Sequence, residues 1–257
     1  MDEFVAAALA AADAAAAAIR PFFRAGIGVE TKSDASPVTV ADRTAEQAMR
    51  AVLQHRLPEH GILGEEGGLD RPEARMRWVL DPIDGTRAFV TGRTTFGILI
   101  ALMDGETPVV GVLDQPITGE RWVGVTGRRT IFRGQYGAAG CRPCPALGRA
   151  ELSCTSPAIF APDEAEAFAR LQAAAGRTSW GGDCYAYGLL ALGQVDVIAE
   201  AGMNVWDWAA LVPVIEGAGG QVRDWAGQPL RPDGDGRVLA VGDPALLGPA
   251  LTALSGG

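Results

Sequence analysis

An apolar segment that ends in two closely spaced carboxylates constrains this chain most. Residues 78–80 (WVL) have the character of a buried strand, and the sequence DPIDGT follows them directly at residues 81–86. The proline and glycine of this stretch are typical of turns, and a glycine lets the backbone approach a ligand closely. We therefore expect a turn that directs the side chains of Asp81 and Asp84 toward one point.

Further acidic residues accompany this turn. Glu65 and Glu66 follow a short apolar segment at residues 61–63, and Asp207 lies far downstream after Trp206. Acidic side chains that converge without histidine or cysteine repel one another unless they bind a hard cation such as Mg²⁺, whose ligands are oxygens. Such ions polarise a phosphate and lower the pKa of an attacking water. The pattern therefore predicts metal-assisted phosphoryl chemistry.

The order and spacing of these motifs point to a known family. The chain resembles the inositol monophosphatase superfamily of Mg²⁺-dependent phosphomonoesterases in the string WVLDPIDGTRAFVTG (residues 78–92), in the preceding GEE (64–66), and in the later WD (206–207) with its two alanines (209–210). The resemblance runs over residues 32–220. It implies the α+β class, with the layered α-β-α-β-α sandwich of the inositol monophosphatase and fructose-bisphosphatase type, and a homodimer.

Within that superfamily the chain is most similar to bacterial histidinol-phosphate phosphatases, in residues 86–89, 99–102 and 185–187. The implied reaction is hydrolysis of L-histidinol phosphate to L-histidinol and phosphate, in histidine biosynthesis. One alternative is another phosphatase of the superfamily, acting on inositol monophosphate, a sugar bisphosphate or 3′-phosphoadenosine phosphate. A second is a non-catalytic module that senses metal or phosphate. Such a module is expected to have lost Thr86 or a metal carboxylate, which this chain retains.

The resemblance also implies a metal site with two or three Mg²⁺ ions. Glu65, Asp81 and the backbone carbonyl of Ile83 would bind the first ion. Asp81, Asp84 and Asp207 would bind the second. Taken singly, the aspartates could be ordinary turn or helix-start residues, but that interpretation does not explain their joint order. Asp207 could fill both roles, because the N-terminus of a helix favours an anion.

Roles around the phosphate follow from the same resemblance. Gly85 and Thr86 would contact the phosphate through backbone N–H groups, and the Thr86 hydroxyl would hold the nucleophilic water. Glu65 and Thr86 would activate that water together. Asp42 would support the threonine or a third metal ion, and an exposed aspartate at a helix start is the alternative. Arg87, where many relatives carry serine or asparagine, could bind phosphate or face solvent.

Two further carboxylates are assigned to the substrate pocket. Asp183 and Glu200 align with the segments that contact the alcohol part of the substrate in the family, and together they suit a cationic alcohol such as histidinol. Asp183 could instead cap the helix that follows it.

Trp180 and Tyr185 could stack on the imidazole or belong to the core. Lys32 could neutralise phosphate charge or be a solvated surface lysine.

Charge and composition exclude other classes of protein. The net charge of −9 argues against a nucleic-acid binder. The alanine-rich N-terminus carries Asp2 and Glu3 in place of basic residues, so we expect an amphipathic helix at residues 2–23 and no signal peptide or membrane span. Cys141 and Cys144 form a C-x-x-C without nearby histidines for zinc. We expect them to be packing residues of a reduced, cytoplasmic protein.

Periodicity and turn signals divide the rest of the chain into elements. We expect helices at residues 40–57, 162–175, 183–192, 206–218 and 244–254, and strands at 61–63, 77–80, 95–103, 109–113, 121–125, 130–133, 151–154, 195–199, 221–225 and 238–241. The glycine- and proline-rich stretch 134–148 is the best linker candidate. We therefore expect two lobes, residues 1–135 with most metal ligands and residues 136–257 with Asp207 and the specificity residues.

Overall fold

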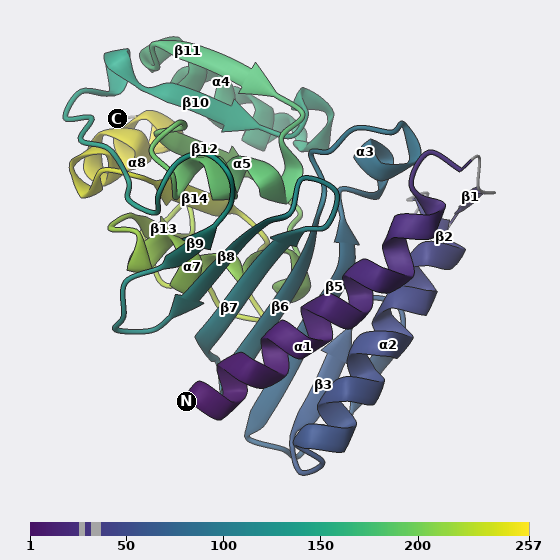
Figure 1. The fold of residues 1–257 in the computed structure, drawn as a ribbon. Coiled ribbons are helices and arrows are strands. Elements are labelled where there is room, and N and C mark those ends of the chain that lie inside the picture. The colour runs from purple at the N-terminus through teal and green to yellow at the C-terminus, as the bar shows by residue number, and fades with distance from the viewer. Residues whose placement is uncertain (26–28, 32–36, 257) are drawn as a thin grey trace.

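The computed structural model describes residues 1–25, 29–31 and 37–256, whose elements are stacked in five layers (Figure 1). Helices α1 and α2 cover one face of a seven-stranded sheet. Helices α5, α6 and α7 lie between that sheet and a five-stranded sheet, whose far face is covered by α4 and α8. The expected α-β-α-β-α sandwich is confirmed. The helices are α1 (Asp2–Ile19), α2 (Val40–Arg56), α3 (Thr86–Val90), α4 (Pro162–Ala174), α5 (Asp183–Leu190), α6 (Val205–Trp208), α7 (Leu211–Gly217) and α8 (Leu247–Ser255).

The seven-stranded sheet brings together the first two acidic segments. β3 and β5 run parallel and the other neighbours antiparallel. Gly64 at the end of β3 pairs with Leu80 of β5, so the two strands that precede the carboxylates lie side by side, as expected. The order of the sheet is β4 (Gly68–Asp70), β3 (Gly61–Gly64), β5 (Met76–Asp84), β6 (Gly97–Asp104), β7 (Thr107–Gln115), β8 (Glu120–Val125) and β9 (Ile131–Arg133). A separate hairpin pairs β1 (Val29–Thr31) with β2 (Pro37–Thr39).

Each face of this sheet belongs to a different core. Along β6, Ile98 and Ile100 pack with the α1–α2 layer, whereas Leu99 and Ala101 pack with the α5–α7 layer. Successive side chains of a strand point to opposite faces, so a strand covered on both faces is a continuous apolar run rather than an alternating one. This explains why the segment around β6 is apolar throughout.

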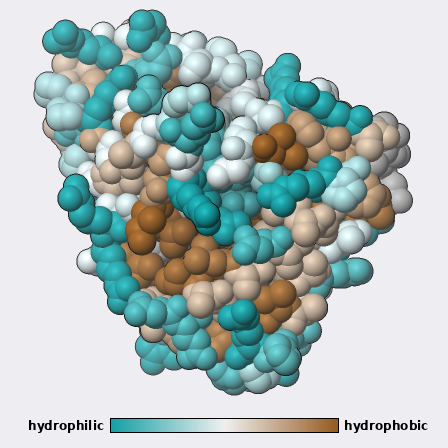
Figure 2. All heavy atoms as spheres, viewed as in Figure 1, coloured by the Kyte–Doolittle hydropathy of each residue, from teal (hydrophilic) through white to brown (hydrophobic). Residues whose placement is uncertain are grey.

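Helix α1 is long and apolar enough to span a membrane by length and composition alone. In the fold the alanines on one face of the helix are buried, and their small side chains let the helix approach the sheet closely. They are Ala7, Ala8, Ala11, Ala12, Ala15 and Ala16. The regular helix ends at Ile19, earlier than expected, and a 3₁₀ turn at Arg20–Phe22 follows, since Pro21 has no N–H to continue the helix. Apolar side chains gather beside α1 over β7 and β8 (Figure 2), where Ile131 of β9 is 67% exposed.

The single helix expected at residues 206–218 is two helices, α6 and α7, joined at Ala209 and Ala210. Pro213 has no N–H to bond the carbonyl four residues earlier, which interrupts the helix. The break also lets the chain approach the sheet, because a Cβ on Gly111 of β7 would lie 2.0 Å from the carbonyl oxygen of Ala210. The expectation of one continuous helix is therefore wrong.

The five-stranded sheet has the order β11 (Arg177–Trp180), β10 (Glu151–Cys154), β12 (Val197–Glu200), β14 (Val238–Val241) and β13 (Gln221–Arg223). β11, β4 and α3 were not expected, since they are short and carry no clear apolar period. Within residues 134–146 the structure shows neither helix nor strand, and a 3₁₀ turn follows at Leu147–Arg149. Helices α5 to α7 pack between both sheets, so the division into lobes at residues 135 and 136 stays a prediction.

Candidate active site

The DPIDGT segment is a bulged strand end, not the expected turn. β5 continues to Asp84, but its pairing with β6 shifts register between Asp81, opposite Leu99, and Asp84, opposite Gly97. A bulge redirects side chains without ending the strand. The N–H of Ile83 donates to Asp81 Oδ1 over 2.9 Å, which fixes the first carboxylate. The expectation of a turn is corrected, because the segment still finds partners on β6.

Asp207 joins the two aspartates of the bulge. One carboxylate oxygen from each of Asp81, Asp84 and Asp207 lies within 4.8 Å of the others. Asp207 is the third residue of α6, and its Oδ2 accepts the N–H of Asn204 over 2.7 Å. It therefore fills the helix-start role while facing the other carboxylates, as its position in the sequence allowed.

Burial and mutual repulsion dominate the electrostatics of this cluster. Burial, followed by the charges of Glu65, Asp84 and Asp207, raises the pKa of Asp81 well above its usual value. Burial and the Asp84 charge raise the pKa of Asp207 in the same way. Burial raises the pKa of Asp84 to about 6, although the N–H of Cys184, which donates to Asp84 Oδ2 over 2.7 Å, lowers it.

These donors fit a hard divalent cation. The converging groups are all carboxylate oxygens, which suit Mg²⁺ rather than the nitrogen and sulfur ligands of zinc. Glu65 follows β3, its N–H donates to the Leu80 carbonyl over 3.2 Å, and its charge raises the pKa of Asp81 and Asp207. Its oxygens lie outside the 4.8 Å group, so Glu65 lies near the cluster rather than within it.

Thr86 and Asp42 meet beside the cluster. The Thr86 hydroxyl lies 3.1 Å from the Ile83 carbonyl oxygen and 3.4 Å from Asp42 Oδ1. Asp42 Oδ2 accepts the N–H and the hydroxyl of Thr39, over 2.8 and 2.6 Å, at the start of α2. Asp42 is buried, and burial raises its pKa. It is thus a helix-start residue that also supports Thr86, and the alternative of an exposed aspartate is wrong.

Gly85 links the bulge to the other half of the chain. It has a φ of +85°, in the left-handed region that glycine tolerates best. A Cβ at this position would lie 3.0 Å from the Cβ of Asp183, so a larger residue would also displace that side chain. α3 begins at the next residue, Thr86, and Arg87 on its first turn is exposed.

A pocket of about 170 Å³ opens from the acidic cluster. Its wall includes Asp84 and Asp207 together with Asp183 and Glu200, so both predicted specificity carboxylates adjoin the cluster. A larger hollow of about 310 Å³ beside α4 also holds carboxylates, but Arg237 pairs with several of them. The smaller pocket is the one that adjoins the acidic cluster, whereas the larger hollow contains carboxylates paired with an arginine.

The two specificity carboxylates are held differently. Burial and the Asp84 charge raise the pKa of Asp183 to about 7, against the lowering effect of Arg93 and Arg87. Gly182 occupies the N-cap of α5 and Asp183 is the first residue of the helix, which contradicts the helix-cap alternative. Burial raises the pKa of Glu200 to about 7, although Glu200 Oε1 accepts the N–H of Thr155 over 2.7 Å, which lowers it.

Sequence reasoning missed the aromatic side chain of this pocket. Tyr187 lines it, with Thr155, Cys184 and Met203. The Tyr185 hydroxyl donates to Glu120 over 2.7 Å, and the ring packs edge-on against Trp122. Tyr185 therefore belongs to the core and does not face the substrate pocket. The helical spacing of residues 183 and 187 is a signal that could have pointed to Tyr187, since residues four apart share a helix face.

The other residues that the sequence suggested for the site lie elsewhere. Trp180 packs against Phe168, with ring centroids 5.5 Å apart. Cys141 and Cys144 are free thiols whose pKa burial raises, in agreement with packing roles. Lys32 lies outside the described residues.

Comparison with known proteins shows a family similarity over nearly the whole chain. The model of the inositol monophosphatase family matches residues 1–254. The chain is 46% identical over 230 residues to the chloroplastic bifunctional phosphatase IMPL2 of Arabidopsis thaliana, covering 89% of this chain and 66% of that protein. It is 38% identical to the histidinol-phosphatase of Mycobacterium tuberculosis, covering 84% of this chain and 85% of that protein.

A solved structure shows the same fold. The structure of an inositol monophosphatase from Zymomonas mobilis superimposes with a TM-score of 0.90 at 50% identity, covering 99% of this chain and 98% of that one. The match therefore includes both sheets and the helices between them. The chain belongs to the inositol monophosphatase family.

Proposed function

We propose that this protein is a Mg²⁺-dependent phosphomonoesterase whose substrate is histidinol phosphate. Family membership supports hydrolysis of phosphate esters. The single observation that carries the proposal is the convergence of Asp81, Asp84 and Asp207 within 4.8 Å, next to a pocket lined by two more carboxylates. The first feature suits a divalent cation, and the second suits a cationic alcohol.

The proposed metal ligands are those that the sequence motif assigns. Glu65, Asp81 and the Ile83 carbonyl would hold one Mg²⁺ ion, and Asp81, Asp84 and Asp207 a second. Bound Mg²⁺ polarises the phosphate, lowers the pKa of a bound water and stabilises the leaving oxygen. The raised pKa values of Asp81 and Asp207 support this assignment, because burial and neighbouring carboxylates raise them and a bound cation would offset both effects.

Thr86 is proposed to orient the attacking water. Its hydroxyl proton is directed to Asp42 or to the Ile83 carbonyl, so its lone pairs are free to accept a hydrogen bond from water. Glu65, which follows β3 beside the cluster, would take the proton of that water. The backbone N–H groups of Gly85 and Thr86 would bind the phosphate. Arg87 is exposed next to them and could add a positive charge there.

Asp183 and Glu200 are proposed to select the alcohol. Histidinol carries a protonated amine, which these two carboxylates would stabilise when ionised. Tyr187 lines the same pocket with a side chain that is 1% exposed, so it shapes the wall around the alcohol. The similarity to the mycobacterial histidinol-phosphatase supports this choice.

Inositol monophosphate is the second candidate substrate, because the Zymomonas mobilis inositol monophosphatase is 50% identical to this chain. Its alcohol offers only hydroxyls to the two carboxylates. A homodimer and a cytoplasmic location, both expected from the sequence, stay predictions.

The decisive experiment measures phosphate release from histidinol phosphate and from inositol monophosphate, each with Mg²⁺ and with chelator. We expect faster release from histidinol phosphate and none in chelator. Faster turnover of inositol monophosphate would overturn the substrate while leaving the phosphatase. Activity that persists in chelator would overturn the metal. No release from either ester would overturn both substrates and favour another ester of the superfamily or the non-catalytic module.

A further inference from the structure

Glu46 is a buried acidic residue that no part of the proposed mechanism uses. It lies on α2, and its side chain is 2% exposed. Its Oε2 accepts the N–H of Glu66 over 2.7 Å, and its Oε1 accepts the N–H of Gly67 over 2.9 Å. Both donors belong to the turn that carries Glu65 between β3 and β4. The carboxylate therefore binds the backbone immediately after Glu65.

The turn is shaped around this carboxylate. A Cβ on Gly64 would lie 2.2 Å from Glu46 Oε1, and one on Gly67 would lie 2.6 Å from it. Glycine at both positions leaves the space that the carboxylate fills. The two residues that flank the Glu65–Glu66 pair thus contact the same side chain, which restricts where the Glu65 backbone can lie.

Arg50 completes the arrangement. Its Nε donates to Glu46 Oε1 over 2.7 Å, and its Nη2 donates to the Gly68 carbonyl over 2.5 Å. The guanidinium balances the Glu46 charge and ties the far end of the turn to α2. Glu46 therefore has its charge and both oxygens satisfied within the protein.

Asp42 lies one helical turn before Glu46, on the same face of α2. Asp42 contacts Thr86, and Glu46 contacts the turn of Glu65. One face of one helix thus reaches both groups proposed to activate the water. We infer that Glu46 is a positioning residue that fixes Glu65 in the geometry required to bind Mg²⁺. This inference rests on the proposed function, since it assigns Glu65 to the metal.

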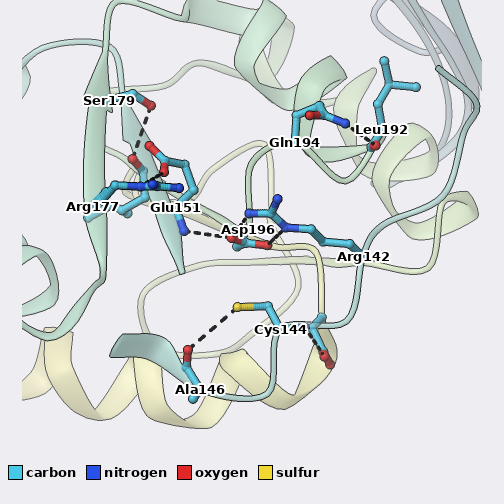
Figure 3. A network of polar contacts seen from close by, with 11 residues as sticks. Arg142, Cys144, Ala146, Glu151, Arg177, Ser179, Leu192, Gln194 and Asp196 are labelled. Carbon is cyan, nitrogen blue, oxygen red and sulfur yellow. Dashed lines mark hydrogen bonds and ion pairs between the residues drawn. The ribbon is translucent and has the colours of Figure 1, made fainter. Parts of the chain in front are cut away.

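Asp196 provides a matched control in the other sheet (Figure 3). It is also a buried carboxylate paired with an arginine, Arg142, whose Nε donates to Oδ1 over 2.7 Å. It also accepts a backbone N–H, that of Glu151, over 2.8 Å. Replacing Asp196 removes the same kinds of contact as replacing Glu46, but at a distance from the acidic cluster.

The test compares Glu46→Gln with Asp196→Asn. In Glu46→Gln an amide NH₂ would face one of the two N–H donors, so the turn must move. Calorimetric titration with Mg²⁺ should show affinity weakened roughly 10- to 100-fold, the usual effect of changing a residue that supports a metal ligand. The kcat should return toward the wild-type value at saturating Mg²⁺. Asp196→Asn should lower the melting temperature and leave Mg²⁺ affinity unchanged.

A second variant covers the case in which Glu46→Gln does not fold. Arg50 is nearer the surface, with its side chain 15% exposed, and Arg50→Gln should weaken Mg²⁺ binding by a smaller factor. Wild-type Mg²⁺ affinity in either folded variant would overturn the positioning role and leave the proposed function intact. If the wild-type protein itself fails to bind Mg²⁺, both fall together.

Discussion

Two aspartates of this molecule are equally buried and oppositely compensated. Asp81, at the bulged end of β5, and Asp196, before β12, are each 1% exposed. Burial alone raises the pKa of both, but the hydrogen bonds of Arg142 and of the Glu151 N–H bring the pKa of Asp196 below its usual value. At Asp81 the neighbouring charges are carboxylates, and they raise its pKa further.

The opposite pKa shifts of Asp81 and Asp196 show which charge each region stabilises. A buried carboxylate is stable as an anion only when a positive charge or several donors lie beside it. The chain supplies that charge to Asp196 from its own sequence. At the acidic cluster, within the described part of the chain, burial and neighbouring carboxylates raise the pKa values, and a bound cation or a proton would relieve that repulsion. The following experiments test this contrast, from the largest expected effect to the smallest.

Removing one charge from the cluster should abolish activity without unfolding the protein. We expect Asp84→Asn to lower kcat by several orders of magnitude, because the variant loses a proposed metal ligand. Its melting temperature in chelator should equal or exceed that of the wild type, because repulsion among the carboxylates is relieved. A loss of stability in chelator would show that the cluster is compensated internally, as Asp196 is.

Thr86 tests whether the acidic region performs chemistry as well as binding. Thr86→Ala should lower kcat roughly 10²- to 10⁴-fold, the range for groups that position or move a proton in the transition state. KM should change far less. Thr86→Ser should keep much of the activity because it retains the hydroxyl. Equal activity of the alanine and serine variants would exclude a role for that hydroxyl.

The pocket carboxylates should matter only for cationic substrates. A hydrogen bond to a charged group contributes roughly 1.5–3 kcal/mol, so Asp183→Asn and Glu200→Gln should each lower kcat/KM for histidinol phosphate about 10- to 100-fold. Glycerol phosphate, whose alcohol is neutral, serves as the control and should be affected much less. Equal losses on both esters would mean that these residues support the site in general.

Breaking the internally compensated pair should affect stability alone. Asp196→Asn should cost about 1–3 kcal/mol in the free energy of unfolding. The figure is modest because the Arg142 side chain is 44% exposed and water can replace its partner. Denaturant unfolding measures the loss, and the kcat of the folded variant should match the wild type. A fall in kcat would link this region to the active site.

Acid should weaken the selection of cations. The pKa of Glu200 is raised to about 7, so the side chain is an anion above that pH and becomes neutral below it. The preference in kcat/KM for histidinol phosphate over glycerol phosphate should therefore fall by up to about tenfold per pH unit below pH 7. Asp183 titrates in the same range, because its pKa is also raised to about 7, so the double variant Asp183→Asn/Glu200→Gln, which still reports the titration of the substrate, should lack this added fall. The same slope in the variant would assign the titration elsewhere.

The local sequence was sufficient to predict a helix or strand when its bounds depend only on its own residues. The strand β10 and the strand β14 begin and end at the expected residues, and α2 ends within one residue of the expected position. The spacing of apolar residues and the preferences of turn residues act over a few positions, so they can be read from the sequence without the tertiary structure. The DPIDGT segment was correctly predicted to direct its carboxylates to the site, but it was predicted as a turn and is a bulged strand end. Only the partner strand β6 shows that pairing continues past Asp81.

Contacts between distant segments were not visible in the sequence. The close approach of the break between α6 and α7 to the sheet depends on Gly111 of β7, which admits the Ala210 carbonyl. The carboxylate of Glu46 appeared only as part of a helical period, although it contacts the turn twenty residues later. Tyr187 belonged to the family resemblance at residues 185–187 and received no role in the site until the pocket showed it with Glu200.

The sequence by itself determined which groups are available: carboxylates after two strands and at one helix start, a threonine after the second strand, and the family to which that order belongs. Only the tertiary structure decided which of them meet and what compensates each charge. The reason is physical. A side chain carries its chemistry wherever it lies, but the pKa of Asp81 or Asp196 depends on burial and on neighbours that the chain brings from tens of residues away.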